Sequence, residues 1–377
     1  MTGAVGRDDP MVVAALRSPI GTAGKALRDL TAAELAAPVL AAVAADLSPL
    51  VPVEVVLGNC MGPGGDVARV ATLAAGLGYD VPALTVDRQC ASGLAAIEVA
   101  TALVHARGGV VLAGGVESAS TAPWRCWPPG PGGSPVRYER APFAPTDIGD
   151  PDMGVAADLL AAEHGVGRER QDAFAARSHQ RAWAATEEGL LDDELVPVGG
   201  LARDERPRKG MTAQRLARLP AAFREGGTVT AGNSCGVNDG AAVVALAPAS
   251  TGLPGLRVLA TATTGVDPNR PGRGLVPAVR AALDRAGLGL DDLDVVELNE
   301  AFAGQVLACC DELGLADDRV CPQGGALALG HPWGASGAVL VVRLFSQLVR
   351  QGRGRYGLAA IAAGGGQGVA MVVEACR

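Results

Sequence analysis

Four short stretches of the sequence carry residue types that could do chemistry. Cys90 precedes a long apolar run. It is either a packed, inert thiol or a nucleophile at a helix N-terminus, where free N–H groups and the helix dipole lower a thiol pKa. Asn299 ends one apolar run, and His331 lies in a Gly/Pro turn before another. Three glycines from Gly364 form an ordinary tight turn or present bare N–H groups to an oxyanion. Taken singly, each stretch is weak evidence for an active site.

The segments around these residues alternate strand-like and helix-like runs separated by glycines, which indicates layers of sheet and helix. The run after Cys90, residues 91–104, is apolar on most faces, as in a buried helix. We therefore expect the N-terminus of this helix, and Cys90 with it, to lie in the interior of an α/β fold.

The two ends of the chain resemble each other in sequence. Residues 38–59 match 278–299, and residues 90–115 match 334–366, in the same order. Chance similarity between Ala/Gly-rich segments is the alternative, but two collinear matches favour a duplicated α/β half. The duplication aligns Cys90 with Gly334 and Asn59 with Asn299. Equivalent loops of two such halves meet at their junction, where we expect a shared site.

The middle of the chain differs from its flanks. Residues 121–235 contain a Pro-rich stretch, a charged helix-like stretch and a basic stretch. We therefore expect a loop domain at 121–235. It would be inserted into an N-terminal half formed by residues 1–120 and 236–254, and a C-terminal half would follow at 255–377.

Composition excludes several classes of partner. The net charge of −8 argues against a nucleic acid or an anionic membrane. The apolar stretches are broken before 18 residues, and the first ten residues lack the apolar segment of a signal peptide. Eight cysteines are scattered without a C-x-x-C pair or a metal-ligand spacing. These features predict a cytoplasmic enzyme with free thiols and without a metal site.

Four motifs, taken together and in this order, resemble the thiolase family: C-A-S-G-L at 90–94, N-E-A-F at 299–302, G-H-P-W-G-A-S-G at 330–337 and G-G-G-Q-G at 364–368. The resemblance covers nearly the whole chain and implies a five-layered αβαβα fold with a loop domain inserted in the first half. It also implies acyl transfer in Claisen-type C–C bond formation or cleavage, with a coenzyme A or carrier-bound thioester as substrate and no permanently bound cofactor.

The resemblance also implies residue roles. Cys90 matches the nucleophile that takes the acyl group, and His331 matches the histidine that activates it. Asn299 matches the asparagine that, with His331, holds the thioester oxygen through a water. The N–H groups of Cys90 and Gly364 match a second oxyanion hole. Contacts to coenzyme A are implied at Met153, Arg208, Ala231, Ser234, Cys235 and Phe302, where Cys235 takes the place of the family's pantetheine-contacting serine. The family forms dimers, and Pro-rich residues 127–135 replace a tetramer-forming loop, so a homodimer is expected.

One position departs from the family pattern. Thiolases carry a second cysteine two residues before the glycine run, and here that position is Ala362, which cannot carry a proton. Cys60 and Cys235 are other thiols near motifs, but nothing in the sequence positions them. Acylation of Cys90 is therefore expected, while the C–C step has alternatives. These are decarboxylative condensation as in ketosynthases, acyl transfer to a heteroatom, and a non-catalytic acyl-binding or scaffold subunit.

Overall fold

The computed structural model describes residues 6–377. The first ten residues, which are not expected to form a signal peptide, therefore lie partly outside the described residues. The strands are β1 (Pro10–Arg17), β2 (Gly21–Thr22), β3 (Pro52–Gly58), β4 (Ala83–Val86), β5 (Val110–Ser118), β6 (Arg125–Trp127), β7 (Val136–Tyr138), β8 (Asn238–Pro248), β9 (Gly255–Gly265), β10 (Val295–Leu298), β11 (Tyr356–Ala363) and β12 (Gln367–Cys376). The helices are α1 (Ala32–Asp46), α2 (Val67–Ala74), α3 (Ser92–Arg107), α4 (Met153–Glu163), α5 (Arg168–Glu187), α6 (Ala213–Leu216), α7 (Leu275–Ala286), α8 (Ala303–Leu313), α9 (Ala326–Leu329) and α10 (Trp333–Phe345).

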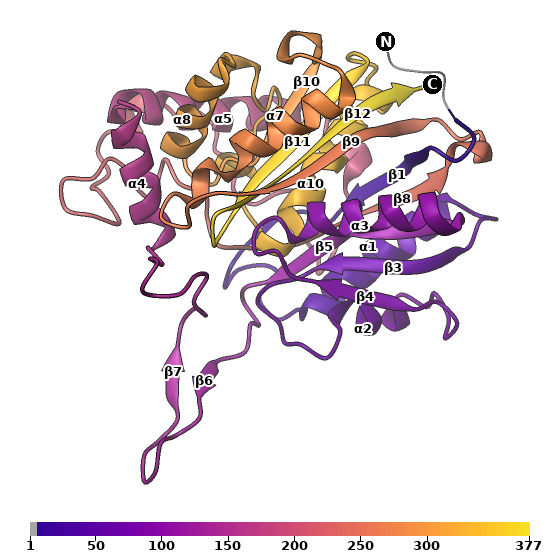
Figure 1. Ribbon diagram of the computed structural model, residues 1–377, viewed down its shortest axis with the longest axis horizontal. Coiled ribbons are helices and arrows are strands. Elements are labelled where there is room, and N and C mark those ends of the chain that lie inside the picture. Colours follow the sequence, from indigo (N-terminus) through magenta and orange to yellow (C-terminus); the bar gives the residue numbers. More distant parts are fainter. Residues whose placement is uncertain (1–5) are drawn as a thin grey trace.

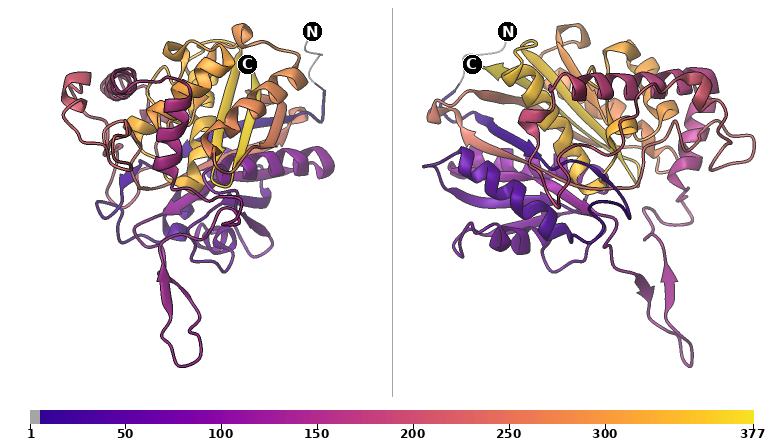
Figure 2. Two further views of the ribbon diagram at one scale, coloured as in Figure 1. Left: turned by 60° about the vertical axis from the view of Figure 1, so that its left-hand side comes forward. Right: turned by 180° about the vertical axis from the view of Figure 1, so that it is seen from behind.

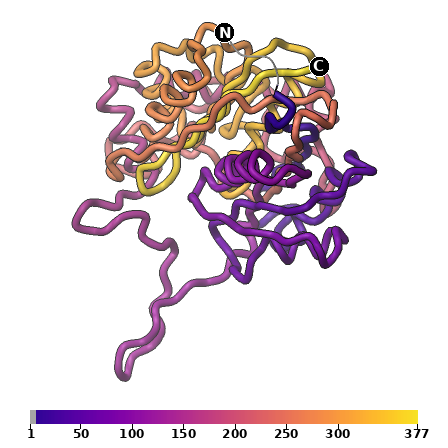
Figure 3. The backbone as a smooth tube through the Cα atoms, turned by 45° about the vertical axis from the view of Figure 1, so that its right-hand side comes forward, coloured from indigo at the N-terminus to yellow at the C-terminus, as the bar shows by residue number. Residues whose placement is uncertain are grey.

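The main strands follow the order β10-β11-β12-β9-β1-β8-β5-β3-β4. Two residue pairs, Met11–Arg257 and Val12–Leu256, join β1 to β9 in the middle of this order. The sheet therefore consists of a C-terminal part, β9 to β12, and an N-terminal part that contains β1, β3, β4, β5 and β8. In Figure 3 the C-terminal part is orange to yellow, and the N-terminal part is indigo to violet except for β8, which has the salmon colour of residues 238–248.

Helices cover both faces of each part, which makes five layers. Along β11, Leu358 and Ala360 pack with α7 and α8, while Ala359 and Ile361 face the core that contains α3 and α10. This alternation follows from the two-residue period of a strand. In the N-terminal part, α1 and α2 cover the outer face, and α3 and α10 lie on the inner one. The predicted αβαβα fold is confirmed (Figure 1).

Helix α3 lies in the central layer. The helical stretch Gln89–Arg107 is long and apolar enough to span a bilayer by length and composition alone. In the structure it packs against α10 and β5, and Leu94, Ile97 and Val104 are buried there. Its apolar character is therefore accounted for by its place between two sheets, as expected for a helix that is apolar on most faces.

The segments that match in sequence occupy corresponding elements. Each half has a helix and a strand that end in asparagine, α1–β3 before Asn59 and α7–β10 before Asn299. Each then has a central helix followed by a strand, α3–β5 and α10–β11.

Residues 121–235 lie outside these layers. Helices α4 and α5 pack against α8, so this segment rests on the C-terminal half. The hairpin β6–β7 projects from the body, as Figures 1 and 2 show, and Trp127 stacks on Tyr138 with ring centroids 4.8 Å apart. The segment thus supplies both a cover over one face and an exposed arm.

Candidate active site

Helices α3 and α10 cross with their first turns in backbone contact. A Cβ atom on Gly93 would lie 2.8 Å from the carbonyl oxygen of Gly334 and 2.9 Å from the nitrogen of Ala338, both too close for a side chain. Only glycine at this position permits the approach. Cys90 lies two residues before α3, and His331 lies two residues before α10. The crossing therefore brings together the two loops that carry them.

A strained turn presents Cys90. Gln89 has a φ of 49°, in the left-handed region that is costly for a residue with a side chain. The Ser92 hydroxyl fixes the turn, because it donates to the Gln89 carbonyl at 2.6 Å and accepts from the Arg88 N–H at 2.8 Å. The N–H groups of Cys90 and Gly364 lie near enough to the Cys90 sulfur to lower the pKa of its thiol. The two predicted oxyanion-hole donors are thus close to the predicted nucleophile.

The protonation state of Cys90 in the free enzyme differs from the lowered thiol pKa that the sequence predicted. Burial raises the pKa of its thiol to about 12, and the nearby carboxylates of Glu117 and Asp87 also raise it. The N–H groups of Cys90 and Gly364 lower it, but desolvation outweighs them. The predicted low pKa is therefore wrong for the free enzyme. Cys90 rests as a thiol, and a base must take its proton when substrate is bound.

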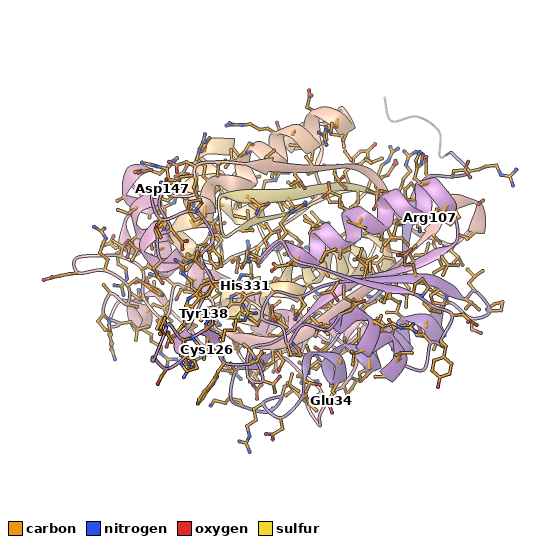
Figure 4. All side chains as sticks on the ribbon, turned by 60° about the horizontal axis from the view of Figure 1, so that its bottom comes forward. Glu34, Arg107, Cys126, Tyr138, Asp147 and His331 are labelled. Carbon is orange, nitrogen blue, oxygen red and sulfur yellow. The ribbon has the colours of Figure 1, made fainter. Side chains whose placement is uncertain are left out.

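His331 has the protonation state that such a base needs. The Ser336 hydroxyl donates to the Pro332 carbonyl at 3.0 Å, so its oxygen accepts from Nδ1–H of His331 at 2.6 Å. This leaves Nε2 unprotonated, 3.4 Å from the Asn299 amide nitrogen. Burial lowers the pKa of His331 to about 4, so its ring is neutral at pH 7. Figure 4 shows His331 in the interior of the molecule, whereas Glu34 and Arg107 lie at its edges.

A cavity of about 430 Å³ opens beside Cys90. Its lining includes Cys90, Gly364, Met153, Cys235 and Phe302, all predicted from the sequence. Asn299 and His331 are buried and do not line it; their near neighbours Phe302 and Trp333 do. The structure thus places Cys90 and Gly364 on the wall of a mostly apolar cavity.

The remaining predicted coenzyme A contacts lie apart from this cavity. Arg208 and Ala231 are exposed and do not line it. Ser234 is buried, and its hydroxyl donates to the Thr230 carbonyl at 2.7 Å. The adjacent Cys235, not Ser234, faces the cavity.

Sequence reasoning did not name most of the other lining residues as site residues, and Trp333 and Arg125 are two of these. Trp333 occupies the variable position of the G-H-P-x-G motif, where its bulk was the available signal. Arg125, in the Pro-rich stretch, reaches the cavity and donates to the Cys60 carbonyl at 3.0 Å. Its place in the fold follows from the hairpin β6–β7, which no short-range pattern indicated.

Comparisons with known proteins identify the family of the chain. The thiolase N-terminal domain model matches residues 10–250, and the thiolase C-terminal domain model matches residues 254–375. The chain belongs to the thiolase family. The β-ketoadipyl-CoA thiolase of Pseudomonas aeruginosa is 44% identical over 96% of this chain and 97% of its own length. An acetyl-CoA acetyltransferase from the same organism is 42% identical over 97% and 99%. The crystal structure of the Bacillus anthracis acetyl-CoA acetyltransferase superposes with a TM-score of 0.91 at 38% identity, covering 99% of this chain and 100% of that one.

Family membership gives the type of chemistry. This thiolase is an acyltransferase that acts on coenzyme A thioesters, with Claisen-type formation or cleavage of a C–C bond. Of the alternatives left by the sequence, a non-catalytic scaffold therefore drops out.

Proposed function

We propose that the enzyme cleaves a 3-oxoacyl-coenzyme A, or forms one in the reverse direction, through an acyl thioester on Cys90. In cleavage, Nε2 of His331 takes the Cys90 proton, and the thiolate attacks the 3-oxo carbon. The C2–C3 bond then breaks, leaving acyl-Cys90 and the enolate of a coenzyme A thioester. After this carbanion takes up a proton, the thiol of a second coenzyme A gives up its proton and attacks acyl-Cys90. The bond between the acyl carbon and the Cys90 sulfur breaks, the shortened acyl-coenzyme A leaves, and His331 returns its proton to the Cys90 thiolate.

The proximity of two backbone N–H groups to the Cys90 sulfur, on the wall of one cavity, carries this proposal. Each tetrahedral intermediate forms on the carbon bonded to that sulfur, so its oxyanion lies within reach of the N–H groups of Cys90 and Gly364. Preorganised donors of this kind are worth about 10²–10³ in rate each. The neutral His331 fits the same scheme, because an imidazole with a free Nε2 can accept the thiol proton.

We further propose that Ala362 stands where other thiolases have their second cysteine. It lies on β11 directly before the glycine turn and pairs with Gly368 of β12. A methyl group neither donates nor accepts a proton, so the carbanion must receive its proton from a different group.

Intact-protein mass spectrometry tests the acyl-enzyme. Incubation with acetyl-coenzyme A is expected to add one acetyl group per chain, and Cys90→Ala is expected to abolish the adduct. Cys126→Ala is the matched control, because it also removes one thiol, here an exposed one on β6. An adduct that persists in Cys90→Ala and disappears in Cys126→Ala would contradict the proposal.

A cytoplasmic homodimer completes the proposal. All eight cysteines are free thiols, as in a reducing compartment. Strand β4 forms an edge of the sheet, and apolar Val70, Leu73 and Leu84 are 42–50% exposed on and beside it. Such an edge is a natural pairing surface for a second copy. Light scattering at micromolar concentration should give twice the monomer mass; four times that mass would refute the dimer.

A further inference from the structure

Two further thiols share the cavity with Cys90. Both Cys60 and Cys235 line it, one before and one after Cys90 in the sequence. Each is also close enough to Cys90 for a negative charge there to raise its own pKa. Although position 362 has no thiol, two other thiols in the cavity could therefore carry the proton for the carbanion. Their surroundings show which of the two is suited to this role.

Backbone contacts hold Cys235 between the two loops that carry Asn299 and His331. The N–H of Cys235 donates to the Ala301 carbonyl at 2.9 Å, directly after Asn299 and Glu300. On the other side, Val237 forms a β-bridge with His331, and the His331 N–H donates to the Asn238 side chain at 3.0 Å. Cys235 is thus fixed relative to the nucleophile's partners by a short run of main chain.

The charge beside Cys235 suits a thiol that gives up its proton and regains it. Burial raises the pKa of Cys235 to about 12, so the group is protonated at rest. The guanidinium of Arg206 opposes this shift. Arg206 packs against Gly236, where any side chain would collide with it, and its buried Nε has no hydrogen-bond partner among residues 6–377. An unpaired cation next to the sulfur stabilises a transient thiolate.

Cys60 has the opposite surroundings. Its thiol donates to the Glu117 carboxylate at 2.8 Å, and burial together with that charge raises its pKa well above the ordinary value. Asp152, a carboxylate on the cavity wall, already accepts from the N–H of Gly154 at 2.9 Å as the N-cap of α4. Arg125 donates to the Cys60 carbonyl, but Glu117 is the charged side chain that acts most on the Cys60 sulfur, whereas the Arg206 cation acts on the Cys235 sulfur.

We infer that Cys235 is the catalytic acid and base at the α-carbon, in the role of the second cysteine of other thiolases, whose position Ala362 occupies here. The inference rests on the proposed acyl-Cys90 mechanism. In cleavage, the S–H bond of Cys235 breaks and its proton forms the new C–H bond of the enolate. The thiolate that remains beside Arg206 then takes the thiol proton of the incoming coenzyme A. In condensation the same thiolate removes the α-proton.

Two half-reactions measured on the full-length enzyme test the inference. Cys235→Ser is expected to leave the final extent of Cys90 acetylation by acetyl-coenzyme A unchanged, but to slow that step, because Cys235 no longer returns the thiol proton to the departing coenzyme A. It is expected to lower α-proton exchange of acetyl-coenzyme A in deuterated water, and thiolysis of acetoacetyl-coenzyme A, by about 10²–10⁴. Serine keeps the shape of the site but is a far weaker acid, so a packing role for Cys235 would leave exchange intact. Cys126→Ser is the control with all rates retained.

Adding Ala362→Cys to Cys235→Ser is expected to restore exchange, because a thiol then faces the α-carbon again. Exchange that survives in Cys235→Ser, or that falls instead in Cys60→Ser, overturns the inference while Cys90 acetylation still stands. Wild-type enzyme that fails to acetylate Cys90 overturns the proposed function itself, and the assignment of Cys235 with it.

Discussion

Gly93 on α3 and Gly334 on α10 touch through their main chains, and this contact sets the distance between the loops of Cys90 and His331. The two glycines come from different halves of the chain. The acylation site is therefore formed by the packing of helices from the two duplicated halves. It depends on the lack of a side chain at Gly93 as much as on the thiol of Cys90 and the imidazole of His331.

Gly93→Ala should damage both stability and rate. The new methyl group would meet backbone atoms of α10, so α3 and α10 must separate, at a cost of about 1–3 kcal/mol in the free energy of unfolding. Turnover should fall further than the lost folded fraction accounts for. Denaturant titration and initial rates check this. Gly130→Ala, at an open site with nothing within 4 Å, should leave both unchanged. Equal behaviour of the two variants would refute the role of the crossing.

Ser336→Ala should lower kcat with little change in KM. Without the hydroxyl, Nδ1–H of His331 loses its acceptor, and the ring no longer holds Nε2 free and aimed. We expect a loss on the order of tenfold, below the about 10²–10⁴ that a complete general base contributes. Ser346→Ala is the matched control, since Ser346 is equally buried but donates to Glu194. A drop in kcat of the same size in both variants would mean that the effect is structural.

Trp333→Leu should shift acyl-chain preference. Trp333 is the bulkiest side chain on the cavity wall, and a leucine frees space next to Cys90. The ratio of kcat/KM for 3-oxopentanoyl-coenzyme A over acetoacetyl-coenzyme A is expected to rise about tenfold, in line with roughly 1–3 kcal/mol for one accommodated methylene. Steady-state kinetics with both substrates measures the ratio. If it stays constant, another wall limits the chain.

Glu300→Gln should change how stability depends on pH. Burial raises the pKa of Glu300 to about 7, so the folded chain holds its proton where the unfolded chain releases it. This contribution to stability is present below pH 4.5 and is lost as pH rises through 7. Glutamine stays neutral and can still accept from Ser178 and Leu327.

The free energy of unfolding of Glu300→Gln, relative to wild type, should therefore rise by roughly 3 kcal/mol between pH 4 and pH 8. Denaturant titrations at both pH values measure this difference. Exposed Glu187→Gln is the control and should show no such rise. A flat difference for Glu300→Gln as well would mean that Glu300 is ionised in the folded protein at neutral pH.

Motifs and repeats predicted the layered fold, because the spacing of apolar residues and the positions of glycines can be read locally in the sequence. They also placed Cys90, Gly364, Cys235 and Phe302 correctly around one cavity. The direction of the Cys90 pKa was predicted wrongly, because a helix terminus can be recognised in a sequence whereas the depth of burial around it cannot. The same limit hid the contrast between Cys60 and Cys235. Glu117 and Arg206 are 57 and 29 residues away from them, and only the fold brings each charge to its thiol.

The family models divide the chain between residues 250 and 254, but the division does not mark two independent units. Helix α10 belongs to the C-terminal half and packs on β5 and β8 of the N-terminal half. A chain cut at that point would yield one fragment with the nucleophile and another with its base. Each fragment would expose the apolar face that the central layer now covers. Neither fragment alone should then be catalytically active. When the two fragments are mixed, activity should depend on their concentrations, because they must associate to form the site.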